Sequence, residues 1–240
     1  IVPVATALNH MDLWLTRGRP RPRRLPHVGG ADLAGIVEST GEGVTAFREG
    51  DEVVVNPALV PREALAMGSD SVLDPSMAIL GEHTWGGHGG LCVVGAHQLV
   101  HKPPARSWTD CAAYPIAHST AWRLLRRAGV GEGTVVLVTG VGGGVATAAM
   151  MLAIHLGAEV LVTSRDHSKR EQALALGAAA AFDSTGDYPR GCDVVFDSVG
   201  PATWDSAIGA LRRGGRMCIC GATSGTTAEL DLPKLFWRQV

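Results

Sequence analysis

The sequence predicts an α/β protein with two parts, a small and mostly antiparallel β-barrel followed by a doubly wound parallel sheet. Short strand-like runs separated by glycine and proline fill the first hundred residues. From about Trp108 onward, helical and strand patterns alternate, which is typical of parallel sheets whose strands are joined by crossover helices. A glycine-rich turn at Gly140–Gly144 joins one of these strands to a helix. We therefore assign residues 1–105 to the barrel and residues 106–240 to the parallel sheet.

The barrel prediction rests on runs that favour extended backbone and are bounded by turn-forming residues. The expected strands are Ile1–Ala5, Ala34–Glu38, Asp51–Val55, Leu91–Val94 and Gln98–His101. The sequence starts at Ile1 inside a strand pattern and stops at Val240 in an apolar stretch. We expect that a piece is missing from each end.

In the second part, a helix is expected over Trp108–Ala128. Pro115 must kink or divide this helix, because proline lacks the N–H that an internal helical bond requires. The expected strands are Val135–Thr139, Val160–Thr163, Ala180–Phe182, Val194–Asp197 and Met217–Cys220. The helices expected between most of them are Val145–Leu156, Ser168–Leu176 and Trp204–Arg212.

One interval, residues 183–192, does not fit this alternation. It must carry the chain from the third strand to the fourth, across the reversal in strand order, yet it has no helical pattern and several helix breakers. A crossover that includes its helix needs about 10–12 residues or more. We expect that a helix-bearing segment near Pro189–Arg190 is absent from this sequence.

Composition excludes several classes of protein. With 240 residues, 46% of them hydrophobic, and a net charge of −2, the chain is a folded globular protein and not a disordered one. No apolar run approaches the ~20 residues of a membrane span, so no membrane partner is expected. The basic stretch Arg17–Arg24 is broken by two prolines and is interpreted as an exposed loop, without a nucleic-acid partner. Five cysteines without a Cys-x-x-Cys pair favour a reducing cytoplasm.

The glycine turn is the strongest local signal for function. Its glycines permit a tight turn and let a pyrophosphate approach backbone N–H groups at the positive end of the next helix. Because position 145 is valine, the spacing departs from the usual Gly-x-Gly-x-x-Gly. The residues expected to lie against a dinucleotide here are Gly140, Gly142, Gly143, Gly144 and Val145.

The end of the second strand of the sheet indicates which dinucleotide is bound. An NAD site would place a carboxylate there for the ribose hydroxyls, whereas this chain has Ser164 and Arg165, with Lys169 one turn later. A guanidinium and an ammonium favour the 2′-phosphate of NADPH over NADH. The alternative is that Arg165 and Lys169 are solvated residues that open a helix. Ser198, Val199, Gly221 and Ala222 follow the fourth and fifth strands and are expected at the same edge.

Several segments, in the correct order along the chain, resemble the medium-chain dehydrogenase/reductase family. They are Ala7–Asp12, Gly30–Val37, Val37–Val53, Leu80–His83, Tyr114–Trp122 and Leu235–Gln239. The last three are similar to a bacterial branch of zinc-type alcohol dehydrogenase-like proteins and quinone reductases. The resemblance covers nearly the whole chain. It implies a GroES-like barrel, a Rossmann sheet, oxidoreductase activity and a homodimer.

The same resemblance implies that zinc is absent. Family members with catalytic zinc place Cys, then His-Glu, then Cys around the metal, and the matching positions here hold Asn9, Ala31-Asp32 and approximately His118. This set supplies at most two good zinc ligands. The family's structural zinc lobe has four closely spaced cysteines, whereas Asn56–Leu80 contains none.

Without a Lewis acid, the expected reaction is hydride transfer to an acceptor that is already electrophilic, a quinone or an α,β-unsaturated carbonyl. Asn9 is expected to donate to the substrate carbonyl or the nicotinamide amide, with loop ordering as its alternative role. Thr120 resembles the family threonine beside the nicotinamide, or is a hydroxyl bonded to its own helix. His118 would donate to a substrate oxygen or protonate the product, or is a satisfied histidine lining a cleft.

Two other functions stay open from the sequence. One is an alcohol dehydrogenase with an atypical metal site. The other is a non-catalytic NADPH-binding protein, because no side chain in the sequence is obligatory for turnover.

Overall fold

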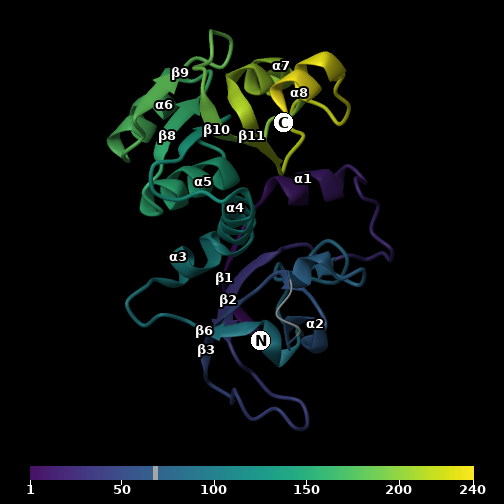
Figure 1. Cartoon of the computed structure of the whole chain (residues 1–240). Helices are drawn as coiled ribbons and strands as arrows, with labels where there is room; N and C mark the ends of the chain where they lie inside the picture. Colours follow the sequence, from purple (N-terminus) through teal and green to yellow (C-terminus); the bar gives the residue numbers. More distant parts are fainter. Residues whose placement is uncertain (67–69) are drawn as a thin grey trace. The chain divides into compact units, whose positions relative to one another are not determined.

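The chain divides into two units, Ile1–Ile116 and Ala117–Val240, in a computed structural model that describes residues 1–66 and 70–240 (Figure 1). Each unit has cores of its own. The boundary between residues 105 and 106 stays a prediction of where the two functional parts meet.

The first unit contains a four-stranded antiparallel sheet in the order β1-β2-β3-β6. Its strands are β1 (Val2–Ala7), β2 (Asp32–Ile36), β3 (Glu52–Val55) and β6 (Leu99–His101). A separate pair joins β4 (Ala58–Leu59) to β5 (Ala78–Ile79). Because successive side chains of a strand point to opposite faces, Leu33 and Val55 enter one core. Ala34 and Val54 enter another.

The helices of the first unit are short. They are α1 (His10–Thr16), α2 (Arg62–Ala66) and α3 (Trp108–Ala113), with 3-10 turns at Ser71–Leu73 and Ala96–Gln98. The helix expected over Trp108–Ala128 is divided at Pro115, as predicted, and α4 (Pro115–Ala128) is its second half. Helix α3 begins where the Ser107 hydroxyl accepts a hydrogen bond from the Asp110 N–H at 3.0 Å.

The strand expected at Leu91–Val94 is wrong, since these residues belong to no strand or sheet. Cys92 pairs with Ile1 through two backbone hydrogen bonds of 2.9 Å, one in each direction. The pairing involves one residue from each segment, and a ladder needs at least a second pair. The residues have strand propensity, but they lack a partner strand.

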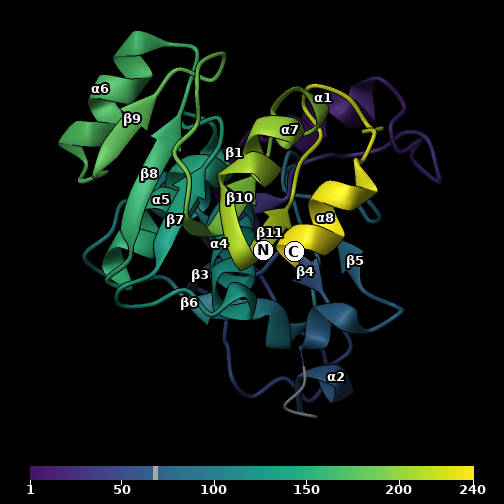
Figure 2. The ribbon, with the colours of Figure 1, turned by 45° about the horizontal axis from the view of Figure 1, so that its top comes forward.

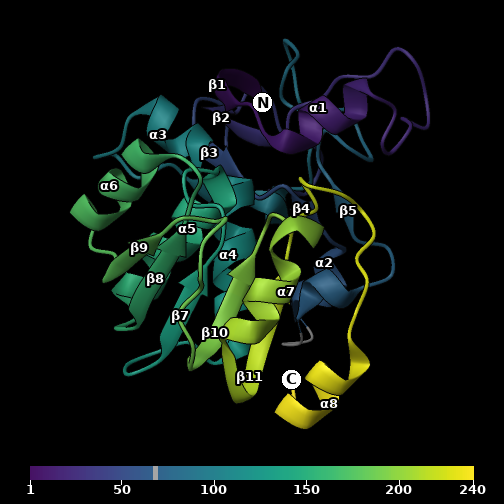
Figure 3. The same ribbon diagram turned by 90° about the horizontal axis from the view of Figure 1, so that it is seen from above.

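The second unit is built on a five-stranded parallel sheet in the order β11-β10-β7-β8-β9 (Figure 3). The strands are β7 (Val135–Val138), β8 (Glu159–Thr163), β9 (Ala180–Phe182), β10 (Cys192–Asp197) and β11 (Leu211–Ile219). All five expected strands are therefore confirmed, although β11 begins earlier than Met217. Val136 and Val160 enter the larger core, whereas Leu137 and Leu161 enter the smaller core on the opposite face.

Helices cover both faces of this sheet. They are α5 (Gly144–His155), α6 (His167–Ala175), α7 (Pro201–Ala210) and α8 (Leu232–Arg238), together with most of α4. Helices α5 and α6 contact β7, β8 and β9, whereas α7 contacts β10 and β11. Helix α8 lies beside β11 (Figure 2), where the Arg238 guanidinium donates to the Leu211 carbonyl at 2.9 Å. None of the helices in the described residues is long and apolar enough to span a membrane.

The helix expected at Trp204–Arg212 has the wrong bounds. It begins three residues earlier, at Pro201, because Gly200 turns the chain with a φ of 94° and proline is suited to the first helical position. It ends at Ala210, and Leu211 starts β11 instead of continuing the helix.

The connection from β9 to β10 contains no helix, as its sequence predicts. The nine residues 183–191 pass β8 and β7, because β9 is an edge strand and β10 lies beyond β7. Three strand spacings, together about 15 Å, and a return of about 20 Å along the strands combine to about 25 Å, which nine extended residues, reaching about 30 Å, can span, so a coil suffices. Whether a helix-bearing segment is missing near Pro189–Arg190 stays a prediction.

Candidate functional site

The glycine turn in the second unit adopts backbone conformations that only glycine adopts readily. Gly140 and Gly142 have φ angles of 68° and 98°. The turn is tied to the end of β8 by two hydrogen bonds. The Val141 N–H donates to the Thr163 carbonyl at 2.8 Å, and the Gly140 N–H donates to the Thr163 hydroxyl at 3.3 Å.

The turn leaves the N-terminus of α5 open. Gly143 is the N-cap residue, and Gly144, Val145 and Ala146 begin the helix, so their N–H groups have no acceptor within it. A Cβ placed on Gly143 would come no closer than 3.7 Å to another heavy atom, and one on Gly144 no closer than 3.9 Å. Open N–H groups at the positive end of a twelve-residue helix are suited to bind an anion.

The loops after β10 and β11 meet the glycine turn at the same edge of the sheet. A Cβ on Gly140 would lie 2.6 Å from the Val199 side chain, and one on Gly221 would lie 2.4 Å from the Ser198 carbonyl. Gly200 approaches Ala222 in the same way. The structure thus brings together the residues predicted after the first, fourth and fifth strands.

Asp197, which ends β10, holds this edge together. Its carboxylate is fully buried and accepts hydrogen bonds from the hydroxyls of Thr139 and Thr203, each at 2.6 Å, and from the Gly200 N–H at 2.8 Å. The three donors come from the ends of β7 and β10 and from the start of α7. The loop that contains Ser198 and Val199 is therefore held in place by the hydrogen bonds of the Asp197 carboxylate.

Replacing Asp197 by alanine is expected to destabilise the protein by at least about 3 kcal/mol, because each buried donor left without an acceptor costs about 1–3 kcal/mol. Urea denaturation measures the change. Asp187→Ala, at an exposed position of the same unit, is the control and should shift the free energy of unfolding by less than about 0.5 kcal/mol. An equal loss in the two variants would contradict this role of Asp197.

The end of β8 carries the predicted cationic residues. Ser164 is buried, and Arg165 and Lys169 are exposed on the turn and the first turn of α6. The aliphatic stem of Lys169 covers Gly142, since a Cβ there would lie 2.4 Å from Lys169 Cδ. Arg165 forms no hydrogen bond or ion pair with any residue that the structure describes. Lys169, one of the two cations predicted to bind a 2′-phosphate, therefore lies against the glycine turn.

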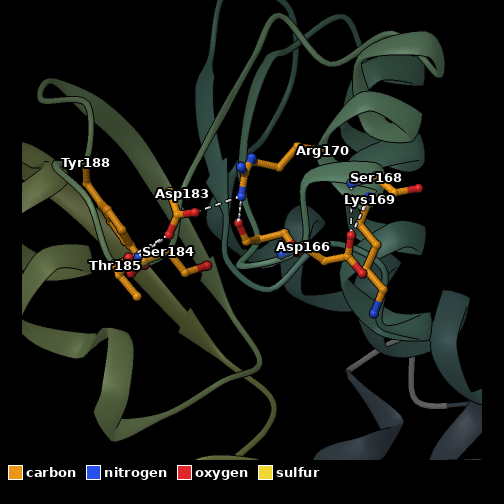
Figure 4. Close-up of polar contacts among 9 residues, drawn as sticks. Asp166, Ser168, Lys169, Arg170, Asp183, Ser184, Thr185 and Tyr188 are labelled. Carbon is orange, nitrogen blue, oxygen red and sulfur yellow. Dashed lines mark hydrogen bonds and ion pairs between the residues drawn. The ribbon is translucent and has the colours of Figure 1, made fainter.

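Arg170 is a nearby cation that is already paired (Figure 4). Its Nη1 donates to the Ser164 carbonyl at 2.5 Å and to the Asp183 carboxylate at 2.9 Å. Hydrogen bonds from the Thr185 N–H and hydroxyl, with a smaller effect of Arg170, lower the pKa of Asp183. Arg170 therefore fixes the Ser164 turn, and its charge is balanced before any ligand binds.

Asn9 in the first unit belongs to a network of hydrogen bonds at the start of α1. Its Nδ2 donates to Asp32 Oδ2 at 2.9 Å, and its backbone N–H donates to Asp12 at 2.7 Å. The other Asp32 oxygen accepts from the Ile116 N–H at 2.8 Å. Asp12 also accepts from the Gly30 N–H at 3.3 Å. The Asn9 amide is thus held in one orientation and has a second N–H for another acceptor.

His118 and Thr120 both lie on α4, in the second unit, and both are partly buried. Residues two apart on a helix do not share a face. Thr120 is three residues after Ala117, whose side chain packs into the larger core beside Gly144, so Thr120 is adjacent to that face. His118 is about 100° away from Ala117 around the helix. The side chains of His118 and Thr120 therefore lie on different faces of α4.

Comparisons with known proteins agree with both units. A family model of alcohol dehydrogenase GroES-like domains matches residues 1–104, and a model of zinc-binding dehydrogenases matches residues 144–240. A zinc-type alcohol dehydrogenase-like protein of Schizosaccharomyces pombe is 34% identical over 94% of this chain and 68% of its own length. The chain belongs to the medium-chain dehydrogenase/reductase superfamily.

Other relatives differ in their named activities. A crotonyl-CoA reductase of Streptomyces avermitilis is 31% identical over 85% of this chain, which spans about half (53%) of the length of that reductase. A solved structure described as an NAD-dependent alcohol dehydrogenase is 38% identical over 98% of this chain and 72% of its own, with a TM-score of 0.90. Membership of the medium-chain dehydrogenase/reductases therefore leaves the cofactor and the substrate to be proposed.

The positions that hold catalytic zinc in some medium-chain dehydrogenase/reductases do not fit a metal here. Both oxygens of Asp32 already accept hydrogen bonds, from Asn9 and Ile116. Among the described residues, no group of three or more His, Cys, Asp or Glu side chains is placed so that it could hold a metal ion. Neutral amides such as Asn9 are poor zinc ligands. The absence of zinc stays a prediction, and its support is this donor set.

Three features of this medium-chain dehydrogenase/reductase escaped the sequence prediction. His88 packs on Gly30, with its Nδ1 3.2 Å from the Thr6 hydroxyl and its Nε2 3.8 Å from Asp12. The Arg170–Asp183 pair and the Thr163 hydroxyl hold the cofactor edge. Each involves partners distant in the sequence. Of these residues, only Asp183 could have been predicted, because it directly follows an expected strand and therefore lies at the carboxyl edge of the sheet.

Proposed function

We propose that this protein is an NADPH-dependent, zinc-independent oxidoreductase that transfers hydride to a quinone or an α,β-unsaturated carbonyl. The observation that carries the proposal is the open N-terminus of α5, lined by Gly142–Gly144, with the stem of Lys169 against Gly142. Membership of a family of NAD(P)-dependent oxidoreductases supports it. Homodimer formation and a cytoplasmic location, both expected from the sequence, stay predictions.

The chain's own groups are suited to hold a dinucleotide. The N–H groups of Gly144 and Val145 bind the pyrophosphate, and the glycines leave room for its close approach. The loops at Ser198–Val199 and Gly221–Ala222 form the neighbouring wall. When it is bound, NADPH supplies the hydride, which carries both electrons of the reduction.

Arg165 and Lys169 distinguish NADPH from NADH in this proposal. Neither side chain pairs with a carboxylate in the part of the chain that the structure describes, so both charges are available to a 2′-phosphate. Arg170 is excluded from this role because Asp183 and Ser164 occupy it. A planar guanidinium binds phosphate with two parallel hydrogen bonds, whereas an ammonium acts as a point charge.

Arg165→Ala is expected to lower the ratio of NADPH to NADH affinity about 10-fold, and the double change with Lys169→Ala about 100-fold, because a charge-assisted hydrogen bond contributes about 1.5–3 kcal/mol. NADH affinity should stay nearly constant. Fluorescence titration of the two cofactors measures both values. Arg190→Ala, at another exposed position of this unit, is the matched control. An unchanged ratio in the double variant would remove the 2′-phosphate assignment.

At the substrate, we assign Asn9 as the hydrogen-bond donor to the carbonyl oxygen. Asp32 and Asp12 fix its orientation, so the donor does not have to reorganise as negative charge develops on that oxygen. We assign the His118 imidazole to protonation of the product. We assign Thr120 to a position beside the nicotinamide. An acceptor that is already electrophilic needs no further polarisation from a metal.

The test follows NADPH consumption by absorbance with three acceptor classes: a quinone, an enal and a saturated aldehyde. We expect oxidation with one of the first two and none with the aldehyde, and no zinc by elemental analysis. Asn9→Ala should lower kcat/KM about 100-fold without changing NADPH affinity. Tight NADPH binding without oxidation by any acceptor would support the non-catalytic alternative instead.

The second candidate is an alcohol dehydrogenase, favoured by the 38% identity to a structure described as an NAD-dependent one. It predicts NAD⁺ reduction by alcohols and about one zinc per chain. The same elemental analysis separates the two candidates.

A further inference from the structure

The segment that follows α1 concentrates positive charge. We call residues 17–24 the arginine loop, because five of its eight residues are arginine and two are proline. All five side chains are exposed. In Figure 1 this loop continues from the C-terminal end of α1. The prolines restrict the backbone, so the charges are presented with less freedom than in a glycine-rich loop.

The charges of the arginine loop are not balanced within the protein. None of its arginines forms an ion pair or a side-chain hydrogen bond in residues 1–66 and 70–240, and no acidic residue occurs between Asp12 and Asp32. The remaining 16 basic residues of the chain are outnumbered by 23 acidic ones. The molecule is therefore electrically asymmetric, and a negatively charged surface attracts this loop and repels the rest.

Exposed leucines flank the arginine loop. Leu8 precedes the N-cap of α1 and is 82% exposed. Leu13, in the middle of α1, is 52% exposed, and Leu25, directly after the loop, is 76% exposed. Leu8 is the residue before the N-cap and Leu13 is the fourth residue of the helix, and side chains at these two positions often pack together. Basic residues combined with exposed leucines are the pair of signals by which proteins bind reversibly to membrane surfaces.

We propose that the arginine loop and its flanking leucines dock this protein onto a membrane surface that contains anionic lipid. Guanidinium groups contact the lipid phosphates, and the leucines enter the region between headgroups and acyl chains. The protein lies on the bilayer surface, which departs from the expectation of no membrane partner, because that expectation rested only on the lack of a membrane-spanning run. A nucleic acid fits less well, because between Leu15 and Ala31 the chain has no aromatic residue except His27, which a bond to the Gly81 carbonyl at 2.9 Å occupies.

The experiment is co-sedimentation with phosphatidylcholine vesicles that do or do not contain phosphatidylglycerol, at low and high salt. We expect binding only to vesicles with phosphatidylglycerol, and weaker binding at high salt. Each basic residue near an anionic surface strengthens binding about fivefold, so Arg19→Ala/Arg21→Ala/Arg23→Ala should weaken it about 100-fold. Leu25→Ser should weaken the binding that persists at high salt.

The matched control is Arg62→Ala/Arg106→Ala/Arg190→Ala, which removes the same charge from exposed positions elsewhere. It should bind vesicles nearly as wild type, and circular dichroism should show that both triple variants are folded. Equal loss in the control would overturn the proposal, since net charge alone would then explain binding. Equal binding to both kinds of vesicle would also overturn it. Retention of a DNA duplex without vesicle binding would assign the loop to nucleic acid instead.

Discussion

Gly143→Asp is expected to weaken NADPH binding at least 100-fold without loss of stability. Gly143 has a φ of −83° and a ψ of 151°, which any residue adopts, and a Cβ there has room. Aspartate is a better N-cap than glycine by a few tenths of a kcal/mol, because its carboxylate accepts the free N–H groups of the first turn. Those N–H groups are the proposed pyrophosphate ligands, and like charges brought together cost several kcal/mol.

Gly143→Ala is the control for this substitution, since it adds a Cβ without charge. It should lower NADPH affinity by less than about 10-fold, and thermal denaturation should show that both variants are folded. Calorimetric titration with NADPH measures the affinities. Wild-type affinity in a folded Gly143→Asp variant would mean that the cofactor does not lie on α5.

The difference in stability between wild type and Asp32→Asn is expected to depend on pH. Burial raises the Asp32 pKa from 3.8 to about 6, so the folded protein binds a proton there more tightly than the unfolded chain does. The stabilisation from protonated Asp32 is complete below about pH 4 and is lost as the pH rises through about 6. Across this window wild type should lose about 3 kcal/mol relative to Asp32→Asn, at 1.36 kcal/mol per pKa unit.

Urea denaturation of both proteins between pH 4 and pH 7 measures this difference, in which shared titrations cancel. Asp12 and His88 also face the network, and their smaller effects on the Asp32 pKa oppose each other. Asp74→Asn is the control of opposite sign, because hydrogen bonds from Ser76 lower the pKa of the exposed Asp74. A wild type that gains stability relative to Asp32→Asn as the pH rises would contradict the assignment.

The elements that local pattern determines were predictable. The alternation of strands and helices from Val135 to Ala210 follows from buried runs and glycine turns, although the proline that begins α7 at Pro201 was not used. The glycine turn was found because its conformation needs glycine at Gly140 and Gly142. The residues predicted after β7, β10 and β11 lie together because carboxyl ends of parallel strands share one edge.

Features that depend on distant partners were not predictable. Leu91–Val94 has strand propensity, but propensity does not supply a neighbouring strand. The buried Asp32 is bonded to Ile116, 84 positions away, and Arg170 on α6 is fixed by Asp183, which follows β9. The sequence does not show whether a cationic side chain has an ion-pair partner, like Arg170, or has none among the described residues, like Arg165. The difference between a structural and a ligand-binding arginine exists only in three dimensions.

The coil between β9 and β10 has a consequence for how this fold can vary. It leaves the carboxyl end of β9, where Asp183 holds Arg170, and enters the amino end of β10, so only its last residues lie away from the edge that carries the glycine turn. Gly191 has nothing within 4 Å of a Cβ position, and Arg190 is exposed. Chain can therefore be inserted, or new termini opened, at this point without rearranging the cofactor edge. Lineages that differ here in length can keep the same nucleotide chemistry.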